Sequence, residues 1–182
     1  MSQSSTDTLA AIVYEPGTGN LADSILAEAA DHLARQGLQV AGAVQQAAND
    51  SAELRCNLVG IDLHSGEKIA LSEDRGKGAR GCRLDSQALE GLVGRTMSVI
   101  DASADALIVS RFGKREAEGG GFRAAIGATA AQGLPVLVSV STEHLAAWRA
   151  FTDGLAIELS PTGEAAALWL DAVARSGSGR KV

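Results

Sequence analysis

The residues best suited to chemistry in this sequence are cations set among glycines. Residues 75–83 contain no acid, and their cations and glycines are Arg75, Gly76, Lys77, Gly78, Arg80, Gly81 and Arg83. Glycine allows consecutive backbone N–H groups to point into one concavity, and guanidinium groups present forked donors that suit tetrahedral oxyanions. This segment predicts a site for a small inorganic anion. The alternative is a solvated basic loop.

A second basic segment follows an apolar run of strand length at residues 104–109. Its polar and charged residues are Ser110, Arg111, Lys114 and Arg115. Three glycines at residues 119–121 then supply a turn or a helix start. The carboxyl ends of parallel strands meet at one edge of a sheet, where ligands bind. We therefore expect both basic segments to face one crevice there.

A third candidate is the glycine-rich junction after the apolar residues 9–14. A phosphate-binding P-loop would read G-x-x-x-x-G-K-[ST] at such a junction. The chain instead has Gly17, Thr18, Gly19 and Asn20, without the lysine and the hydroxyl residue in their places. This degenerate P-loop is either a weak anion site at a helix start or a plain glycine-rich turn.

The other reactive residue types form no recognisable site. The three histidines are scattered without metal-ligand spacing, so no metal site is predicted. Cys56 and Cys82 lack the C-x-x-C spacing and indicate reduced thiols in a cytoplasmic protein. Ser110 lies outside any G-x-S-x-G motif, and Cys82 has no neighbouring base. We assign no catalytic residue.

Composition excludes several classes of protein. The 182 residues carry a formal net charge of −6, and aromatic residues make up only 3%. An acidic surface and few stacking side chains argue against a nucleic-acid-binding protein. No apolar run reaches the ~18 residues that a membrane helix needs, and residues 1–8 do not resemble a secretory signal. We therefore expect neither a nucleic-acid nor a membrane partner.

The order of the predicted elements indicates an α/β fold. Apolar runs predict strands at residues 9–14, 38–44, 104–109, 134–140 and 155–159. Helical periodicity predicts a helix from residue 21 to a Gly37 cap, and others at residues 86–100, 122–131, 144–151 and 163–174. Residues 58–71 predict a β-hairpin inserted into a mostly parallel sheet, and residues 72–84 a loop. We expect one domain at residues 9–175 between flexible ends at 1–8 and 176–182.

Three segments resemble a known bacterial family, the one catalogued as domain of unknown function 2478. They are residues 37–45, residues 76–85 and residues 109–123, which include the distinctive Arg-Phe-Gly-Lys-Arg-Glu-Ala-Glu-Gly at 111–119. The family resembles degenerate relatives of the thermophile-type nucleoside-triphosphatases. The resemblance implies a three-layer P-loop-NTPase-like domain over about residues 9–160.

One departure from those enzymes changes the expected chemistry. Their Asp-Glu pair at the end of the strand matched by residues 106–109 is replaced here by Ser110 and Arg111. Without that pair and the P-loop lysine, no magnesium ligand and no water-orienting base is evident. We therefore expect the fold without the hydrolysis, although the sequence does not decide whether the chain is an enzyme.

The resemblance also implies a setting, because genes of this family are associated with molybdate transport. The leading hypothesis is a non-catalytic protein that binds molybdate or tungstate for molybdenum storage or handling. The alternatives are a nucleotide-binding phosphohydrolase with Gly17, Gly19 and Lys114 near the phosphates, and a module whose basic loops dock an acidic protein. Alanine-rich helices at 122–131 and 163–174 suggest a homo-oligomer.

Overall fold

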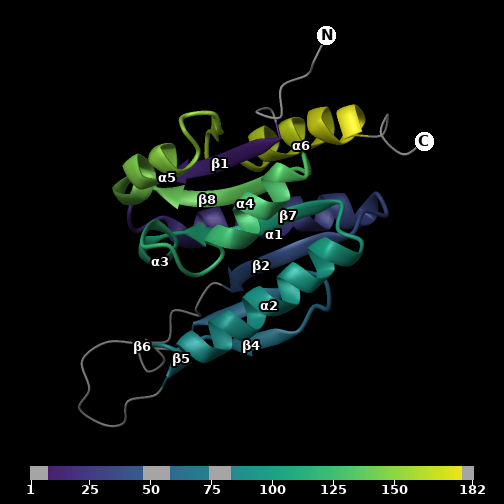
Figure 1. The fold of residues 1–182 in the computed structure, drawn as a ribbon. Helices are drawn as coiled ribbons and strands as arrows, with labels where there is room; N and C mark the ends of the chain where they lie inside the picture. The colour runs from purple at the N-terminus through teal and green to yellow at the C-terminus, as the bar shows by residue number, and fades with distance from the viewer. Residues whose placement is uncertain (1–7, 47–57, 74–82, 178–182) are drawn as a thin grey trace.

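The computed structural model describes residues 8–46, 58–73 and 83–177. A seven-stranded sheet with the strand order β4-β3-β2-β7-β8-β1-β9 forms the central layer of the molecule (Figure 1). Its parallel strands are β1 (Leu9–Tyr14), β2 (Val40–Gln46), β7 (Ala106–Phe112), β8 (Val136–Ser141) and β9 (Ile157–Leu159). The predicted hairpin, β3 (Val59–Asp62) and β4 (Lys68–Ala70), extends the β2 edge in antiparallel fashion.

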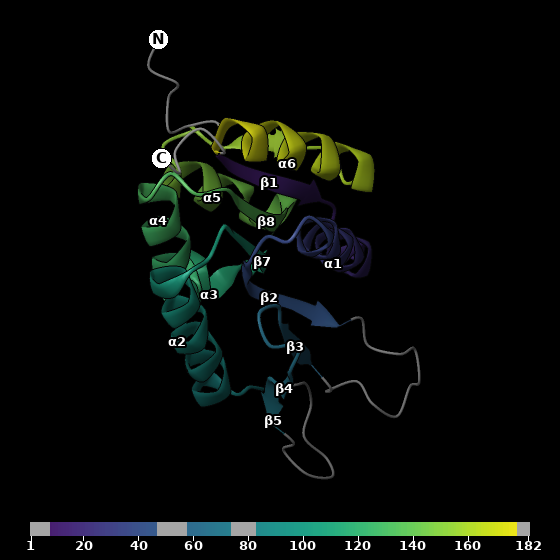
Figure 2. The same cartoon turned by 90° about the vertical axis from the view of Figure 1, so that its right-hand side faces the viewer.

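Helices cover both faces of this sheet and make three layers (Figure 2). One face packs against α1 (Gly19–Arg35) and α6 (Gly163–Gly177), and the opposite face against α2 (Ser86–Ala102), α4 (Arg123–Ala131) and α5 (Leu145–Phe151). Because both faces are covered, the parallel strands are nearly continuous apolar runs, and every residue of β8 is buried. The predicted α/β fold with a mostly parallel sheet and an inserted hairpin is confirmed.

The two cores contain the apolar faces that the sequence periodicity predicted, except that Leu21 at the start of α1 is exposed. Leu26 and Leu33 of α1 pack with Leu170 of α6 on one side of the sheet. Leu92 of α2 and Ile126 of α4 lie in the core on the other side. Each of these side chains is at most 2% exposed, so their burial stabilises the packing of helices on both faces of the sheet.

One glycine is required where two strands approach closely. Gly42 of β2 has φ +113°, and a Cβ there would lie 1.9 Å from the carbonyl oxygen of Ile108 in β7. No other residue fits this contact, because real Cβ atoms do not approach a backbone oxygen so closely and a side chain disfavours this φ.

The structure corrects several predicted boundaries. Strand β7 continues to Phe112 instead of ending at residue 109, with a register shift against β8 between Val109 and Phe112. Polar residues such as Ser110 and Arg111 do not predict a buried strand. They nevertheless belong to β7, where Ser110 is buried and its hydroxyl donates a hydrogen bond to Asp23 of α1. The predicted loop at 72–84 contains strand at both ends. Its ends pair as β5 (Ser72–Glu73) and β6 (Arg83–Leu84).

Two short helical segments complete the chain after β7 and β8. The first is α3 (Lys114–Ala117), and the second is the 3₁₀ turn η1 (Thr142–His144), which leads into α5. In the described part of the chain, we find no helix whose length and apolar character would let it cross a lipid bilayer.

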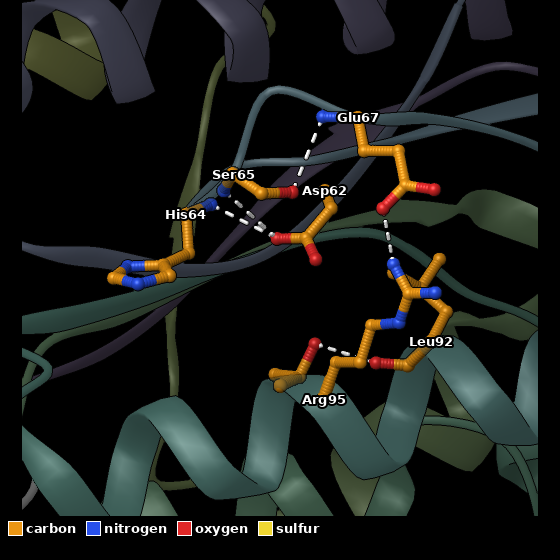
Figure 3. A network of polar contacts seen from close by, with 7 residues as sticks. Asp62, His64, Ser65, Glu67, Leu92 and Arg95 are labelled. Atoms are coloured by element: carbon orange, nitrogen blue, oxygen red, sulfur yellow. Dashed lines mark hydrogen bonds and ion pairs between the residues drawn. The ribbon is translucent and has the colours of Figure 1, made fainter.

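An ion pair joins the hairpin to α2, and hydrogen bonds within the hairpin shape its turn (Figure 3). The Asp62 carboxylate is buried and accepts hydrogen bonds from the backbone N–H groups of His64, at 3.0 Å, and Ser65, at 3.4 Å. Glu67 then forms an ion pair with Arg95 of α2. A short polar side chain that binds the backbone beyond itself is a typical turn former, so these residues define the turn and its orientation.

Candidate functional site

A pocket of about 370 Å³ opens at the carboxyl ends of β1, β7 and β8. Its lining residues are Tyr14, Pro16, Gly17, Gly19, Asn20, Arg111, Phe112, Gly113, Ser141, Glu143 and His144. Open parallel sheets bind ligands at this edge, above the N-termini of the helices that follow the strands. The fold therefore brings the degenerate P-loop and the end of β7 to one concave site.

The first turn of α1 presents unpaired backbone donors to this pocket. Thr18 precedes the helix but makes no capping bond, since its hydroxyl donates to the Glu15 carbonyl at 2.7 Å. In the described residues, the N–H groups of Gly19 and Asn20 have no hydrogen-bond acceptor. Unsatisfied N–H groups and the helix dipole make such a turn attractive to anions.

Arg111 lies against the same turn. A Cβ at Gly19 would meet the Nη2 atom of Arg111 at 3.0 Å and its Nη1 atom at 3.1 Å. The guanidinium also lies 5.8 Å from the centre of the Tyr14 ring, and the side chain is 33% exposed. The structure thus places Arg111 beside Gly17, Gly19 and Asn20 in one pocket.

Beneath the pocket, Asp23 forms a buried polar cluster that sequence reasoning missed. Asp23 is 3% exposed. Its carboxylate accepts hydrogen bonds from the Ser110 hydroxyl and, at 2.9 Å, from Arg111 Nη2. Ser110 is buried below the pocket and does not line it. A signal was present in the sequence, because Asp23 shares the apolar face of α1 with Leu26, at helical spacing.

Tyr14 forms another wall of the pocket. Burial raises the pKa of its hydroxyl above the ordinary 10.0, while the neighbouring Arg111 opposes this shift. The hydroxyl therefore keeps its proton at neutral pH and can donate or accept a hydrogen bond.

Acidic side chains lie near the other wall of the pocket, after β8. The exposed Glu143 and the half-buried His144 line the pocket. Thr142 donates to a carboxylate oxygen of Glu15 at 3.0 Å, which joins the loop after β1 to η1. Sequence reasoning missed Ser141 and Glu143, because nothing in the linear order shows that the ends of β1 and β8 are neighbours.

The remaining predicted residues lie elsewhere or outside the described ranges. Lys114 is 79% exposed and 3.9 Å from Glu118, and Arg115 donates to the Ser86 hydroxyl at 2.9 Å. Neither residue lines the pocket. Arg83 belongs to β6. The other members of the first basic segment, namely Arg75, Gly76, Lys77, Gly78, Arg80 and Gly81, lie outside the described residues.

The segment after β7 is held together by Glu116, which is 6% exposed. Its carboxylate accepts hydrogen bonds from the N–H groups of Gly113, at 3.0 Å, and Phe122, at 3.1 Å. Gly121 has φ +56°, and a Cβ there would lie 2.1 Å from Glu116 Oε1. Glu116 thereby fixes Gly113, a residue of the pocket wall, and this contact accounts for part of the distinctive motif at 111–119.

Metal ligands do not gather at this site. Across residues 8–46, 58–73 and 83–177, no group of three or more His, Cys, Asp or Glu side chains is placed to hold a metal ion. The donors at the pocket are instead N–H groups of the backbone and of a guanidinium, which bind anions.

Comparison with known proteins identifies one relative and one family. The chain is 33% identical over 151 residues to the protein of Bradyrhizobium diazoefficiens named molybdenum import ATP-binding protein ModC 2, and the match covers 83% of this chain but 17% of that protein. No solved structure matches the chain. The sequence model described as "Protein of unknown function (DUF2478)" matches residues 9–169, so the chain belongs to this family.

Proposed function

We propose that the pocket between β1, β7 and α1 binds a small tetrahedral oxyanion without converting it. One observation carries this proposal: the guanidinium of Arg111 lies against Gly19, where α1 begins with unpaired N–H groups. Both kinds of donor converge on one concave space. A partly desolvated setting strengthens their attraction for an anion compared with bulk water.

Molybdate and tungstate are the first candidates for the anion. The support is the match to a protein whose name assigns it to molybdenum import. Since the chain spans only 17% of that protein's length, the import activity of the whole protein is not transferred. We propose instead a role in the storage or handling of molybdenum in the cytoplasm. We also propose that the chain forms a homo-oligomer, which light scattering would test.

The polar residues of the site support binding in preference to hydrolysis. Asn20 and Leu21 follow the glycine that begins α1, where a P-loop has lysine and a serine or threonine. The related enzymes have an acidic pair at the end of the strand that matches β7, and such a pair binds a cation. This chain has Ser110 and Arg111 at that position, and the guanidinium of Arg111 favours an anion. The Asp23 carboxylate is engaged by Arg111 and Ser110, which leaves it poorly placed to orient water.

A nucleotide is the second candidate ligand. The pocket volume of about 370 Å³ exceeds what a tetrahedral oxyanion fills and lies within the range of small-molecule sites. The matched relative is named as ATP-binding. In this alternative, the phosphates would lie at Gly17, Gly19 and Arg111, and the site would be a rearranged nucleoside-triphosphatase.

Calorimetric titration of the purified chain separates these candidates. The ligands are molybdate, tungstate, sulfate, phosphate, ATP and GTP, each with and without magnesium. Saturable binding of molybdate or tungstate without magnesium supports the proposal. Binding of ATP or GTP only with magnesium, together with release of phosphate, supports the nucleotide alternative and overturns the non-catalytic reading.

A pair of charge-matched variants locates the site. Arg111→Met removes the cation of the pocket, so oxyanion affinity should fall at least roughly tenfold, the equivalent of about 1.4 kcal/mol. Arg95→Met removes the same charge from the surface of α2, where Arg95 pairs with Glu67 (Figure 3), and should leave affinity unchanged. Equal affinities of both variants and the wild type would place the anion elsewhere.

A further inference from the structure

Asp23 is a buried acid next to the cation that the proposed function uses. Its carboxylate is 3% exposed, in the second turn of α1. Among the described residues, Arg111 is the only positively charged side chain that contacts this carboxylate. A buried carboxylate without such a partner is strongly destabilising.

The same contact determines where Arg111 lies and how much of its charge is available. Nη2 donates to Asp23 at 2.9 Å, and the guanidinium is thereby held against the first turn of α1. In the described part of the chain, the buried Nε–H of Arg111 has no hydrogen-bond partner. Arg111 therefore reaches the pocket with its charge opposed by a neighbouring carboxylate.

We propose that Asp23 is the internal counter-ion of Arg111, a positioning residue that holds the guanidinium at the pocket and lowers the affinity of the site for anions. The inference rests on the proposed oxyanion site. Asp23 and a bound anion would compete for the same cation. The Asp23 carboxylate would also repel the anion, because little water lies between them to screen the two negative charges. A site built in this way binds its anion reversibly, which suits a protein that passes the anion on.

Substitution of Asp23 separates its charge from its hydrogen bonds. In Asp23→Asn, the amide oxygen can still accept from Arg111 Nη2, and the amide nitrogen can donate to the Ser110 hydroxyl, which rotates to accept. The guanidinium thus keeps its place while the opposing charge is removed. In Asp23→Ala, both contacts are lost and Arg111 is no longer held.

The test uses titration with sodium molybdate and with sodium phosphate as probes. Asp23→Asn should bind roughly tenfold more tightly than the wild type, and Asp23→Ala more weakly. Asp62→Asn is the matched control, because Asp62 is also a buried acid but belongs to the hairpin, outside the pocket. Its affinity should equal that of the wild type.

The outcomes distinguish this inference from the proposed function. If Arg111→Met abolishes binding but Asp23→Asn binds like the wild type, the counter-ion role is wrong and the anion site stands. If Arg111→Met binds like the wild type, the anion site itself is wrong.

A measurement without ligand tests the pairing directly. Arg111→Met leaves the buried Asp23 carboxylate without its cation and should lower the Tm by roughly 5–10 °C. Adding Asp23→Asn to that variant removes the uncompensated charge, so at least half of the loss should be recovered. No recovery in the double variant overturns the counter-ion role whatever the titrations show.

Discussion

Arg111 and Gly19 are in tight contact at the first turn of α1: a Cβ at Gly19 would lie 3.0 Å from Arg111 Nη2, so the guanidinium would have to move by a few tenths of an ångström. Gly19 is the first residue of α1, where glycine costs less than the about 0.5–1 kcal/mol that it costs inside a helix. Gly19→Ala should therefore change the stability of α1 little, and its main effect should be on the contact with Arg111.

Gly19→Ala should thus separate the stability of the fold from the function of the site. The methyl group shifts the guanidinium by a few tenths of an ångström and narrows the pocket, so oxyanion affinity should fall by roughly tenfold. The Tm should change little, because a shift of this size leaves Arg111 within reach of Asp23. Calorimetric titration and thermal unfolding measure the two effects. Gly91→Ala, in α2 with open space around it, should raise the Tm without changing affinity. Unchanged affinity in Gly19→Ala would contradict the placement of the anion beside Arg111.

Glu116 should be essential for the stability of the segment after β7. Glu116→Ala leaves the N–H groups of Gly113 and Phe122 without acceptors, and such charge-assisted bonds contribute about 1.5–3 kcal/mol each. We expect a loss of about 2–4 kcal/mol in the free energy of unfolding, measured by denaturant titration. Glu118→Ala, an exposed neighbour on the same segment, should change it by less than about 0.5 kcal/mol.

Gly42 and Gly66 offer a matched test of close approach against backbone strain. Both have positive φ, at +113° and +75°, but only Gly42 faces a neighbouring backbone oxygen, whereas a Cβ at Gly66 would meet nothing within 4 Å. Gly66→Ala should cost about 1 kcal/mol. Gly42→Ala should cost more than about 3 kcal/mol or prevent folding, because β2 and β7 must separate. Similar losses in both variants would show that the strand contact is unimportant.

The ion pair between Arg149 and Glu158 predicts a small pH dependence of stability. The Arg149 guanidinium donates to both carboxylate oxygens, at 2.6 and 2.8 Å, and this hydrogen bonding lowers the pKa of Glu158 below its ordinary 4.5. A carboxyl group with a lowered pKa in the folded state stabilises the protein above its unfolded pKa, and the contribution disappears as the pH falls through the folded one.

Glu158→Gln should therefore have a slightly lower Tm than the wild type at pH 7. That difference should vanish as the pH falls below 4.5, where the wild type loses the same charge. The effect is small, because both side chains are partly exposed and the pair is screened by water and salt. A Tm difference that grows toward acid pH would mean that the Glu158 charge does not contribute in this way.

Prediction from the sequence succeeded where burial is decided locally. The apolar runs of β1, β7 and β8 and the amphipathic pattern of α1 follow from the need to remove apolar side chains from water, which acts on each segment according to its own residues. The strand ends were harder to predict. The polar residues Ser110 and Arg111 belong to β7 only because α1 offers them a buried partner, and a local pattern contains no information about that partner.

The candidate site shows the same division. The glycines of the degenerate P-loop and the cation Arg111 are visible in linear order, so the residue types available for an anion could be predicted. Which of them meet depends on the fold: Arg111 lies against Gly19, Asp23 lies beneath it, and Lys114 and Arg115 do not line the pocket. The physical reason is that charges and hydrogen bonds depend on distances of a few ångströms between residues far apart in the chain, and the order of β1, β7 and β8 in the sheet sets those distances.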